Sequence, residues 1–283
     1  PEGIAHDPRS GAFFVGSLNK DKIVRVDSGG RVSDFVASGR DGLWDVLGMK
    51  VDPAGGSLWA CSAAGTGGAD RQSASALFRF DLASGALLGK HLLPGDVPHL
   101  CNDVALGPGG EAYVTDSNAG AVYRLRPGGE TLEPLAVPGT FIYPNGIAIT
   151  PDGAWLIVAD FSKGLSRVEV ATGAVHRLSR PERVQVAGLD GIYLHGGRLI
   201  AVQNSSGVER IVRFRLSPGL DAVESVEVLE SRNPLFRIPT TGVVAGESFV
   251  YLANSLLDRL DDQGRLRPDA QLEEVIVLEL PLN

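Results

Sequence analysis

A short phrase recurs six times along the chain: usually a polar residue, then in most copies a glycine, then an apolar run. Its fullest copy, NGIAITPDG, spans residues 145–153, and a second apolar run follows at 155–160. The second residue of each copy falls at positions 3, 48, 103, 146, 191 and 242, which are 43–55 residues apart. A period of that length built from short strands is typical of a propeller or a similar array of sheets.

Each repeat predicts four antiparallel strands. The phrase forms the first strand, a turn with Asp, Pro and Gly follows, and the next strands alternate apolar with polar or basic residues. Six such repeats without a helical period predict an all-β, six-bladed β-propeller, with residues 1–283 as a single domain. Evenly spaced strands also occur in β-sandwiches, but these do not reuse one phrase.

The sixth repeat runs out of sequence after its third expected strand, at residues 274–280. We therefore expect a three-stranded last blade within this chain, whose outermost strand is either missing or supplied by residues preceding Pro1. The sequence also begins inside a repeat, without an initiator Met. We expect that an upstream segment has been removed, and the chain could be cytoplasmic or exported.

Composition and charge narrow the classes of molecule that the chain is expected to bind. The formal net charge is −8, and Lys and Arg form no cluster, which argues against nucleic acid and anionic membrane surfaces. No apolar run approaches the ~20 residues of a membrane-spanning helix. A small molecule is therefore the expected partner. Two cysteines, Cys61 and Cys101, have neither metal-ligand spacing nor a disulfide framework, so we expect two buried free thiols.

The opening residues of the six phrases carry the functional prediction. In chain order they are Glu2, Leu47, Asn102, Asn145, Asp190 and Thr241. The first strand of each propeller blade lines the central channel, so equivalent positions converge on the axis. A lone Asn-Gly or Asp-Gly is more often a turn than a ligand, but four oxygen donors here share one repeat phase.

Glu2, Asn102, Asn145 and Asp190 would present two carboxylates and two amide oxygens in a narrow channel. Two charges placed close together there are costly without a cation. An all-oxygen set suits Ca²⁺, which takes ~6–8 oxygen ligands. Mg²⁺, Mn²⁺ or Zn²⁺ are the alternatives, because ligand type fixes metal identity only loosely.

With these residues the chain resembles the senescence marker protein/gluconolactonase family, which includes luciferin-regenerating-enzyme-like proteins. The resemblance is carried by PEGI at 1–4, ND at 102–103, PNGIA at 144–148, PDG at 151–153 and LDGI at 189–192. It implies a six-bladed propeller with a divalent cation, usually Ca²⁺, on the residues matching Glu2, Asn102, Asn145 and Asp190. It also implies hydrolysis of lactones or, in some members, of organophosphate esters, with Asp190 as base or nucleophile.

The sequence departs from the family in two places. Gluconolactonases carry an Arg two residues before the Asn-Asp pair, where this chain has Leu100. A sugar lactone therefore loses an expected anchor, which His99 could replace, although a lone His is more often structural. No His lies near Thr241, where an organophosphatase would carry one.

Other candidate substrate contacts follow from their places in the repeats. Asp103 adjoins a proposed ligand, Tyr143 precedes a first strand, and Phe161 and Asn204 follow the ends of second strands. Such aromatic residues could form a pocket wall, although packing is their commoner role, and Asp103 could equally be structural.

Three functions remain in competition. The sequence favours a metal-dependent lactonase acting on a substrate less polar than gluconolactone. The alternatives are an esterase or organophosphate hydrolase with the same metal, and a non-catalytic propeller whose metal is structural.

Overall fold

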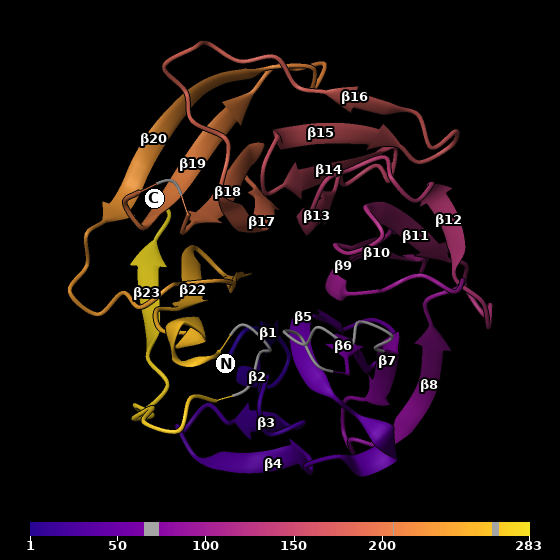
Figure 1. Cartoon of the computed structure of the whole chain (residues 1–283), viewed down its shortest axis with the longest axis vertical. Helices are drawn as coiled ribbons and strands as arrows, with labels where there is room; N and C mark the ends of the chain where they lie inside the picture. The colour runs from indigo at the N-terminus through magenta and orange to yellow at the C-terminus, as the bar shows by residue number, and fades with distance from the viewer. Residues whose placement is uncertain (65–73, 206, 262–265) are drawn as a thin grey trace.

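A ring of antiparallel sheets surrounds a central axis in this computed structural model, which describes residues 1–64, 74–205, 207–261 and 266–283. Within those ranges, five sheets have four strands and one has three (Figure 1). Each sheet takes its strands consecutively from the chain. The predicted six-bladed β-propeller is therefore confirmed.

The first three blades contain strands β1 to β12. In blade one these are β1 (Ile4–Asp7), β2 (Ala12–Gly16), β3 (Ile23–Val26) and β4 (Val32–Val36). In blade two they are β5 (Asp45–Asp52), β6 (Ser57–Ala63), β7 (Ser75–Asp81) and β8 (Leu87–Leu92). In blade three they are β9 (Cys101–Leu106), β10 (Ala112–Asp116), β11 (Ala121–Leu125) and β12 (Glu133–Ala136).

The other three blades contain strands β13 to β23. In blade four these are β13 (Pro144–Ile149), β14 (Trp155–Asp160), β15 (Gly164–Glu169) and β16 (Val175–Arg177). In blade five they are β17 (Leu189–His195), β18 (Arg198–Gln203), β19 (Arg210–Leu216) and β20 (Val223–Ser231). In blade six they are β21 (Gly242–Ala245), β22 (Ser248–Leu252) and β23 (Val277–Pro281).

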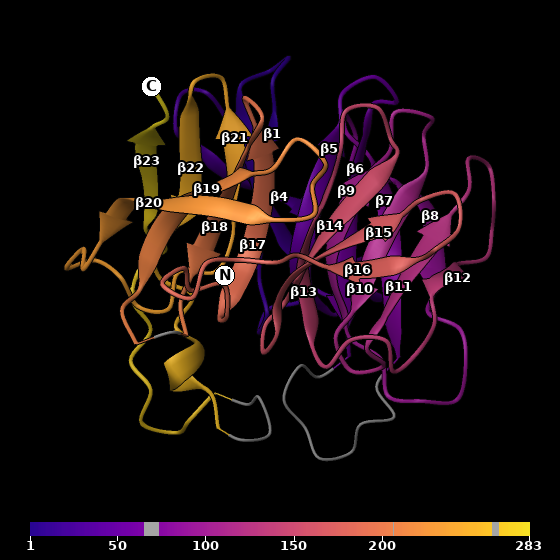
Figure 2. The same cartoon turned by 90° about the horizontal axis from the view of Figure 1, so that it is seen from above.

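The last blade ends its pairing at β23, in the order β21-β22-β23. This confirms the prediction of a three-stranded last blade, although β23 begins at Val277, later than the expected 274. Helical structure in the described ranges is limited to two 3-10 turns, η1 (Arg40–Gly42) and η2 (Leu257–Arg259). In Figure 2, η2 lies beyond the strands at one end of the ring.

Six hydrophobic clusters hold the ring together, one at each boundary between neighbouring blades. Second strands are the most apolar, because both faces of each sheet are covered: every residue of β6 is buried. The cluster between blades six and one is the smallest, with Ile4 and Val15 packed near Val250 and Leu252.

Close approach of the first strands explains the glycine in the repeated phrase. A Cβ atom on Gly3 would collide with the carbonyl oxygen of Leu47 on blade two. A Cβ atom on Gly146 would likewise collide with the carbonyl oxygen of Asp190 on blade five. Glycine lets the backbones of neighbouring blades meet at the axis, as close backbone approach requires.

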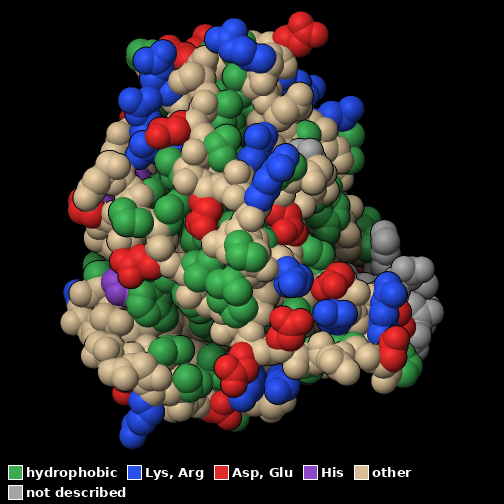
Figure 3. All heavy atoms as spheres, turned by 90° about the vertical axis from the view of Figure 1, so that its left-hand side faces the viewer, with side chains coloured by type: hydrophobic (Ala, Val, Ile, Leu, Met, Phe, Trp, Pro, Cys, Tyr) green, Lys and Arg blue, Asp and Glu red, His purple; other side chains and the backbone are tan. Residues whose placement is uncertain are grey.

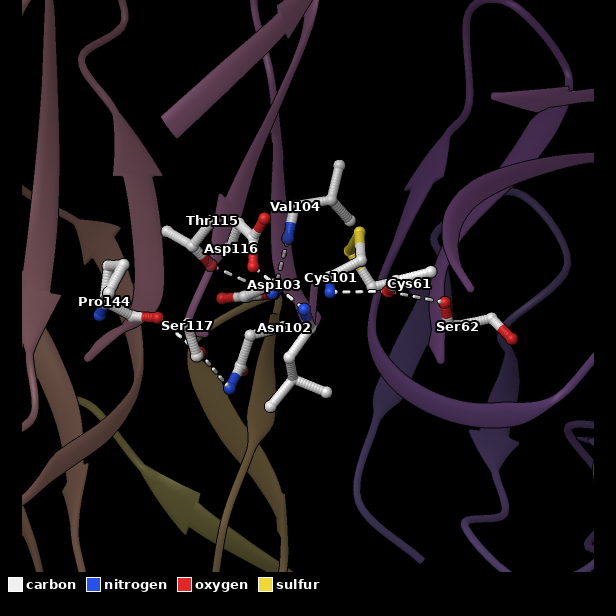
Figure 4. Close-up of a disulfide and its surroundings, with 12 residues drawn as sticks. Cys61, Ser62, Cys101, Asn102, Asp103, Val104, Thr115, Asp116, Ser117 and Pro144 are labelled. Carbon is white, nitrogen blue, oxygen red and sulfur yellow. Dashed lines mark hydrogen bonds between the residues drawn. A yellow bond between two sulfur atoms is a disulfide. The ribbon is translucent and has the colours of Figure 1, made fainter. Parts of the chain in front are cut away.

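The two cysteines form a disulfide, which corrects the expectation of free thiols. Cys61 on β6 and Cys101 on β9 have Cα atoms 5.1 Å apart and lie 40 residues apart in sequence. Spacing could not reveal the pair, because the two residues meet only when blades two and three pack together. Figure 4 shows that the bond joins these blades beside Asn102.

The outer surface carries charges of both signs. On the face of β20 and β23, hydrophobic, acidic and basic side chains are interspersed (Figure 3). No helix within the described residues has the length and apolar character needed to cross a membrane.

Candidate functional site

Four opening residues lie buried at one end of the channel, where first strands begin and second strands end. We call this the opening end. The side chains of Glu2, Asn102, Asn145 and Asp190 belong to residues only 5–6% exposed. They come from blades one, three, four and five. The shared repeat phase therefore places them at the same end of the ring.

Both candidate carboxylates have raised pKa values, chiefly because they are buried. Burial and the negative charges of Asp190 and Asp103 raise the pKa of Glu2 well above its usual value. Burial raises the pKa of Asp190 to about 7, and the side-chain amides of Asn204 and Asn145 oppose that rise. Within the described structure, Oε2 of Glu2 and Oδ1 of Asp190 are buried without a hydrogen-bond partner. Two buried oxygens in this state are normally stabilised by a proton or a cation.

The other oxygen of Asp190 is held in place. Asn204 donates from Nδ2 to Oδ2 of Asp190 at 2.7 Å and to the Pro239 carbonyl at 2.9 Å. This amide therefore fixes the carboxylate relative to the connection into blade six. Asn204, predicted as a substrate contact, also lines a cavity of about 550 Å³ with Glu209 and Arg232.

Asn102 is oriented by blade three and anchored to blade four. Its Nδ2 donates to Oγ of Ser117 at 2.9 Å, and the Ser117 hydroxyl donates to the Pro144 carbonyl at 2.6 Å (Figure 4). Because the nitrogen of this amide is engaged, its oxygen is the atom available to a cation. The same chain of bonds fixes the residue preceding Asn145.

Asp103 occupies the position that glycine fills in all five other repeats. Its carboxylate accepts backbone N–H bonds from Val104 at 2.8 Å and, across to blade four, from Ile147 at 3.2 Å. Burial raises its pKa, and nearby Lys50 partly opposes that change. The geometry gives Asp103 a structural link between blades three and four; contact with a substrate stays a prediction.

His99 is buried against Asp116. Its Nδ1 lies 2.5 Å from Oδ2 of Asp116, and its Nε2 lies 3.3 Å from the Gly95 carbonyl. The hydrogen bond that His99 donates to the Asp116 carboxylate raises the pKa of His99 despite its burial. Both ring nitrogens have protein partners in this geometry, so a substrate contact would require His99 to exchange one of them.

Tyr143 and Phe161 lie together beside the start of β13. Their rings meet edge to face with centroids 6.2 Å apart, and the Phe161 N–H donates to the Tyr143 carbonyl at 2.9 Å. Both side chains are half-buried. They are placed at the opening end, consistent with either a pocket wall or packing.

The opening residue Thr241 and its neighbour Thr240 close the ring. The hydroxyls of Thr240 and Thr241 both donate to the Glu2 carbonyl, the first at 3.1 Å. Blade six thereby holds the backbone of a candidate ligand on blade one. Leu47, the remaining opening residue, has no oxygen in its side chain and is buried in the cluster between blades two and three.

The donor set fits a hard divalent cation in chemistry. It offers carboxylate and amide oxygens, two of which are buried and unpartnered, and such oxygens are the ligands Ca²⁺ prefers. No group of three or more His, Cys, Asp and Glu residues suited to a metal is found among the described residues. Half of the proposed set is asparagine, so the set does not depend on such a group.

Sequence reasoning overlooked the middle of the channel. Lys50 and Tyr193 lie two residues after the glycines of their phrases, and the Lys50 ammonium sits 5.0 Å from the centre of the Tyr193 ring. The sequence did contain a signal for them, because both lie three residues after the opening residue of their repeat and so share one repeat position.

Comparison with known proteins supports the architecture. No family model matches the chain, and no curated protein matches it in sequence. Among solved structures, a gluconolactonase from Xanthomonas campestris has a TM-score of 0.64 at 20% identity, covering 89% of this chain and 82% of that one. Regucalcin from Agrobacterium tumefaciens, described as a calcium-binding protein, has a TM-score of 0.61 at 18% identity, covering 90% and 82%.

The same fold also carries other activities. A streptogramin B lyase has a TM-score of 0.64 at 17% identity, covering 100% of this chain and 83% of that one. At these identities the likeness establishes the fold, and the site must carry the functional argument.

Proposed function

We propose that the opening end binds a divalent cation, Ca²⁺ in preference to Mg²⁺, Mn²⁺ or Zn²⁺, through Glu2, Asn102, Asn145 and Asp190. The observation that carries the proposal is the pair of buried carboxylates, each with an unpartnered oxygen. Their raised pKa values reflect how costly both charges are in this place. A cation would offset that cost, and the amide oxygens of two further blades would complete its surroundings.

We further propose that the protein hydrolyses the ester bond of a lactone. A bound cation would supply Lewis-acid stabilisation of negative charge on the ester carbonyl oxygen. Asp190 would accept a proton from water or attack as nucleophile, and Asn204 would hold its Oδ2 in one orientation. A gluconolactonase and the calcium-binding protein regucalcin are among the proteins that share this fold, which is compatible with the proposal.

The substrate class follows from what lies beside the site. Leu100 is buried, and the neighbouring His99 is engaged by Asp116. Polar anchors for a polyhydroxylated ring are therefore reduced on this side. We propose an aliphatic or otherwise less polar lactone as substrate.

Two alternatives use the same residues. An esterase or organophosphate hydrolase would share the cation. A non-catalytic propeller would use it only to join blades, and the hydroxyl bonds from blade six to the Glu2 carbonyl are the observation that favours such a role.

The deciding experiment combines binding with turnover. Metal-free protein is titrated calorimetrically with Ca²⁺, Mg²⁺, Mn²⁺ and Zn²⁺. A panel of aliphatic lactones, sugar lactones, aryl esters and organophosphates is then assayed with Ca²⁺ or EDTA. Lactone hydrolysis that EDTA abolishes and Ca²⁺ restores is the expected result. Cation binding without any turnover would favour the structural role, and no cation binding would reject the site itself.

A further inference from the structure

A second ring of channel residues lies two positions after the second residue of each phrase. It contains Ala5, Lys50, Ala105, Ala148, Tyr193 and Val244. Four of these side chains are small or apolar, so Lys50 and Tyr193 are the large polar members. They belong to blades two and five, which face each other across a six-membered ring. The cation–π contact between them therefore bridges the channel.

A cavity of about 1170 Å³ begins at this ring and opens at the other end of the channel. We call that end the turn end, because the cavity is lined by the hairpin turns around residues 52–55 and 107–110. None of the four candidate metal ligands lines it. The cavity is therefore separate from the opening end, and the proposed hydrolase does not use it.

Three lining residues form a row across one face of blade two. Lys50 pairs with Trp59 across β5 and β6, and Trp59 pairs with Arg79 across β6 and β7. Directly paired side chains lie on the same face about 4.5–5.5 Å apart at Cβ. The row therefore runs about 10 Å outward from the axis, with an indole between two cations.

Two donors in this row lack protein acceptors. Within the described structure Lys50 makes no hydrogen bond or ion pair, and the oxygens of nearby Asp103 accept backbone N–H bonds from Val104 and Ile147. Trp59 is 6% exposed, and its Nε1 is buried without a partner.

We propose that this turn-end cavity binds a small organic monocarboxylate, with Lys50 Nζ as its charged donor and the paired Trp59 ring as part of the wall beside it. An ammonium that has lost much of its water forms a strong charge-assisted bond to a carboxylate. Burial also lowers the pKa of Lys50, as expected for an ammonium set among apolar channel walls.

The charged residues that line the cavity favour a ligand with one negative charge over a ligand with several. Asp52, Glu111 and Glu130 line the cavity together with Lys50, Arg79 and Arg126, so the lining has no surplus of positive charge, and the whole chain carries a formal charge of −8. A phosphate or a polycarboxylate would meet repulsion from these acids. The apolar channel residues instead suit a carboxylate with an apolar body.

The test uses benzoate as probe and its neutral isostere benzamide as control. With ¹⁵N-tryptophan labelling, the indole N–H signal of Trp59, assigned by its loss in Trp59→Phe, is followed by NMR during titration. We expect benzoate to shift this signal and benzamide to leave it unmoved. Calorimetry then gives the affinity for each variant, with inorganic phosphate as a third probe.

Lys50→Met should weaken benzoate binding at least about tenfold, because it removes the charged donor. Lys90→Met is the matched control: Lys90 lies over Trp44 on the opposite face of the same blade, and its loss should leave affinity unchanged. Thermal unfolding verifies that both variants fold. Equal shifts with benzamide, no binding, unchanged affinity in Lys50→Met, or tighter binding of phosphate would each overturn the proposal.

Discussion

At the opening end, the candidate ligands could be predicted from the repeated phrase, but the residues that hold them could not. Glu2, Asn102, Asn145 and Asp190 share a repeat phase, and that phase could be read directly from the sequence. Their partners could not be, because Asn204 and Ser117 reach them from the ends of other strands. Asp103 was ambiguous for the same reason: its bond to Ile147 crosses to another blade.

Substitutions at the two acids should have separable effects if the proposed function holds. Asp190→Asn should abolish lactone turnover, because it removes the base or nucleophile. Glu2→Gln should chiefly weaken cation affinity, because it removes one ligand charge while Asp190 remains. Steady-state kinetics and calorimetry on both variants measure the two effects. Full activity in Asp190→Asn would exclude the role given to this residue.

The His99–Asp116 pair should make stability depend on pH. The pKa of His99 is raised in the folded protein by its bond to Asp116. Its stabilising contribution is therefore fully present below the unfolded-state pKa of about 6.5 and is lost as pH rises through the higher folded-state pKa.

His99→Gln should accordingly lose more stability near about pH 6 than near about pH 9, measured by urea unfolding. His195→Gln, at the end of β17, is the comparison variant. A loss that is equal at both pH values would contradict the charged pair.

At the scale of elements, the strands could be predicted and their cross-links could not. Alternation, turns and the shortened sixth repeat indicated the blades, including the three-stranded last one. The prediction that Cys61 and Cys101 are free thiols was wrong, because their disulfide depends on how β6 and β9 pack. Likewise, the Lys50–Tyr193 contact depends on blades on opposite sides of the ring.

The disulfide should contribute measurably to stability. It closes a loop of about 40 residues, for which chain entropy predicts about 4 kcal/mol. Replacing both cysteines by alanine, or reducing the bond, should lower the free energy of unfolding by roughly 2–4 kcal/mol. Denaturant unfolding with and without reductant measures this, and alkylation of the unfolded protein counts the thiols. Identical midpoints in both conditions would contradict a stabilising bond.

For the whole molecule, the ring is held least strongly where blade six meets blade one. The hydrophobic cluster there is the smallest of the six, and the hydroxyls of Thr240 and Thr241 bind the Glu2 carbonyl beside it. A cation shared by blades one, three, four and five would fix Glu2, whose carbonyl blade six holds, and would thereby support this boundary indirectly.

The proposed cation should therefore stabilise the entire ring. At free Ca²⁺ of about 100 times its Kd, mass action adds about 2.7 kcal/mol to the free energy of unfolding. Differential scanning calorimetry with Ca²⁺ and with EDTA measures the change, which Glu2→Gln should diminish. An unchanged melting temperature would argue against a cation bound in the folded ring.

The contact between Lys50 and Tyr193 limits the passage of small molecules along the central channel. Although the six blades form a tube, a lactone-sized solute would have to part these two side chains to pass from one side to the other. Substrate should therefore enter, and product leave, through the opening end alone. An inhibitor bound at the turn end should then leave the apparent affinity for a substrate bound at the opening end unaltered.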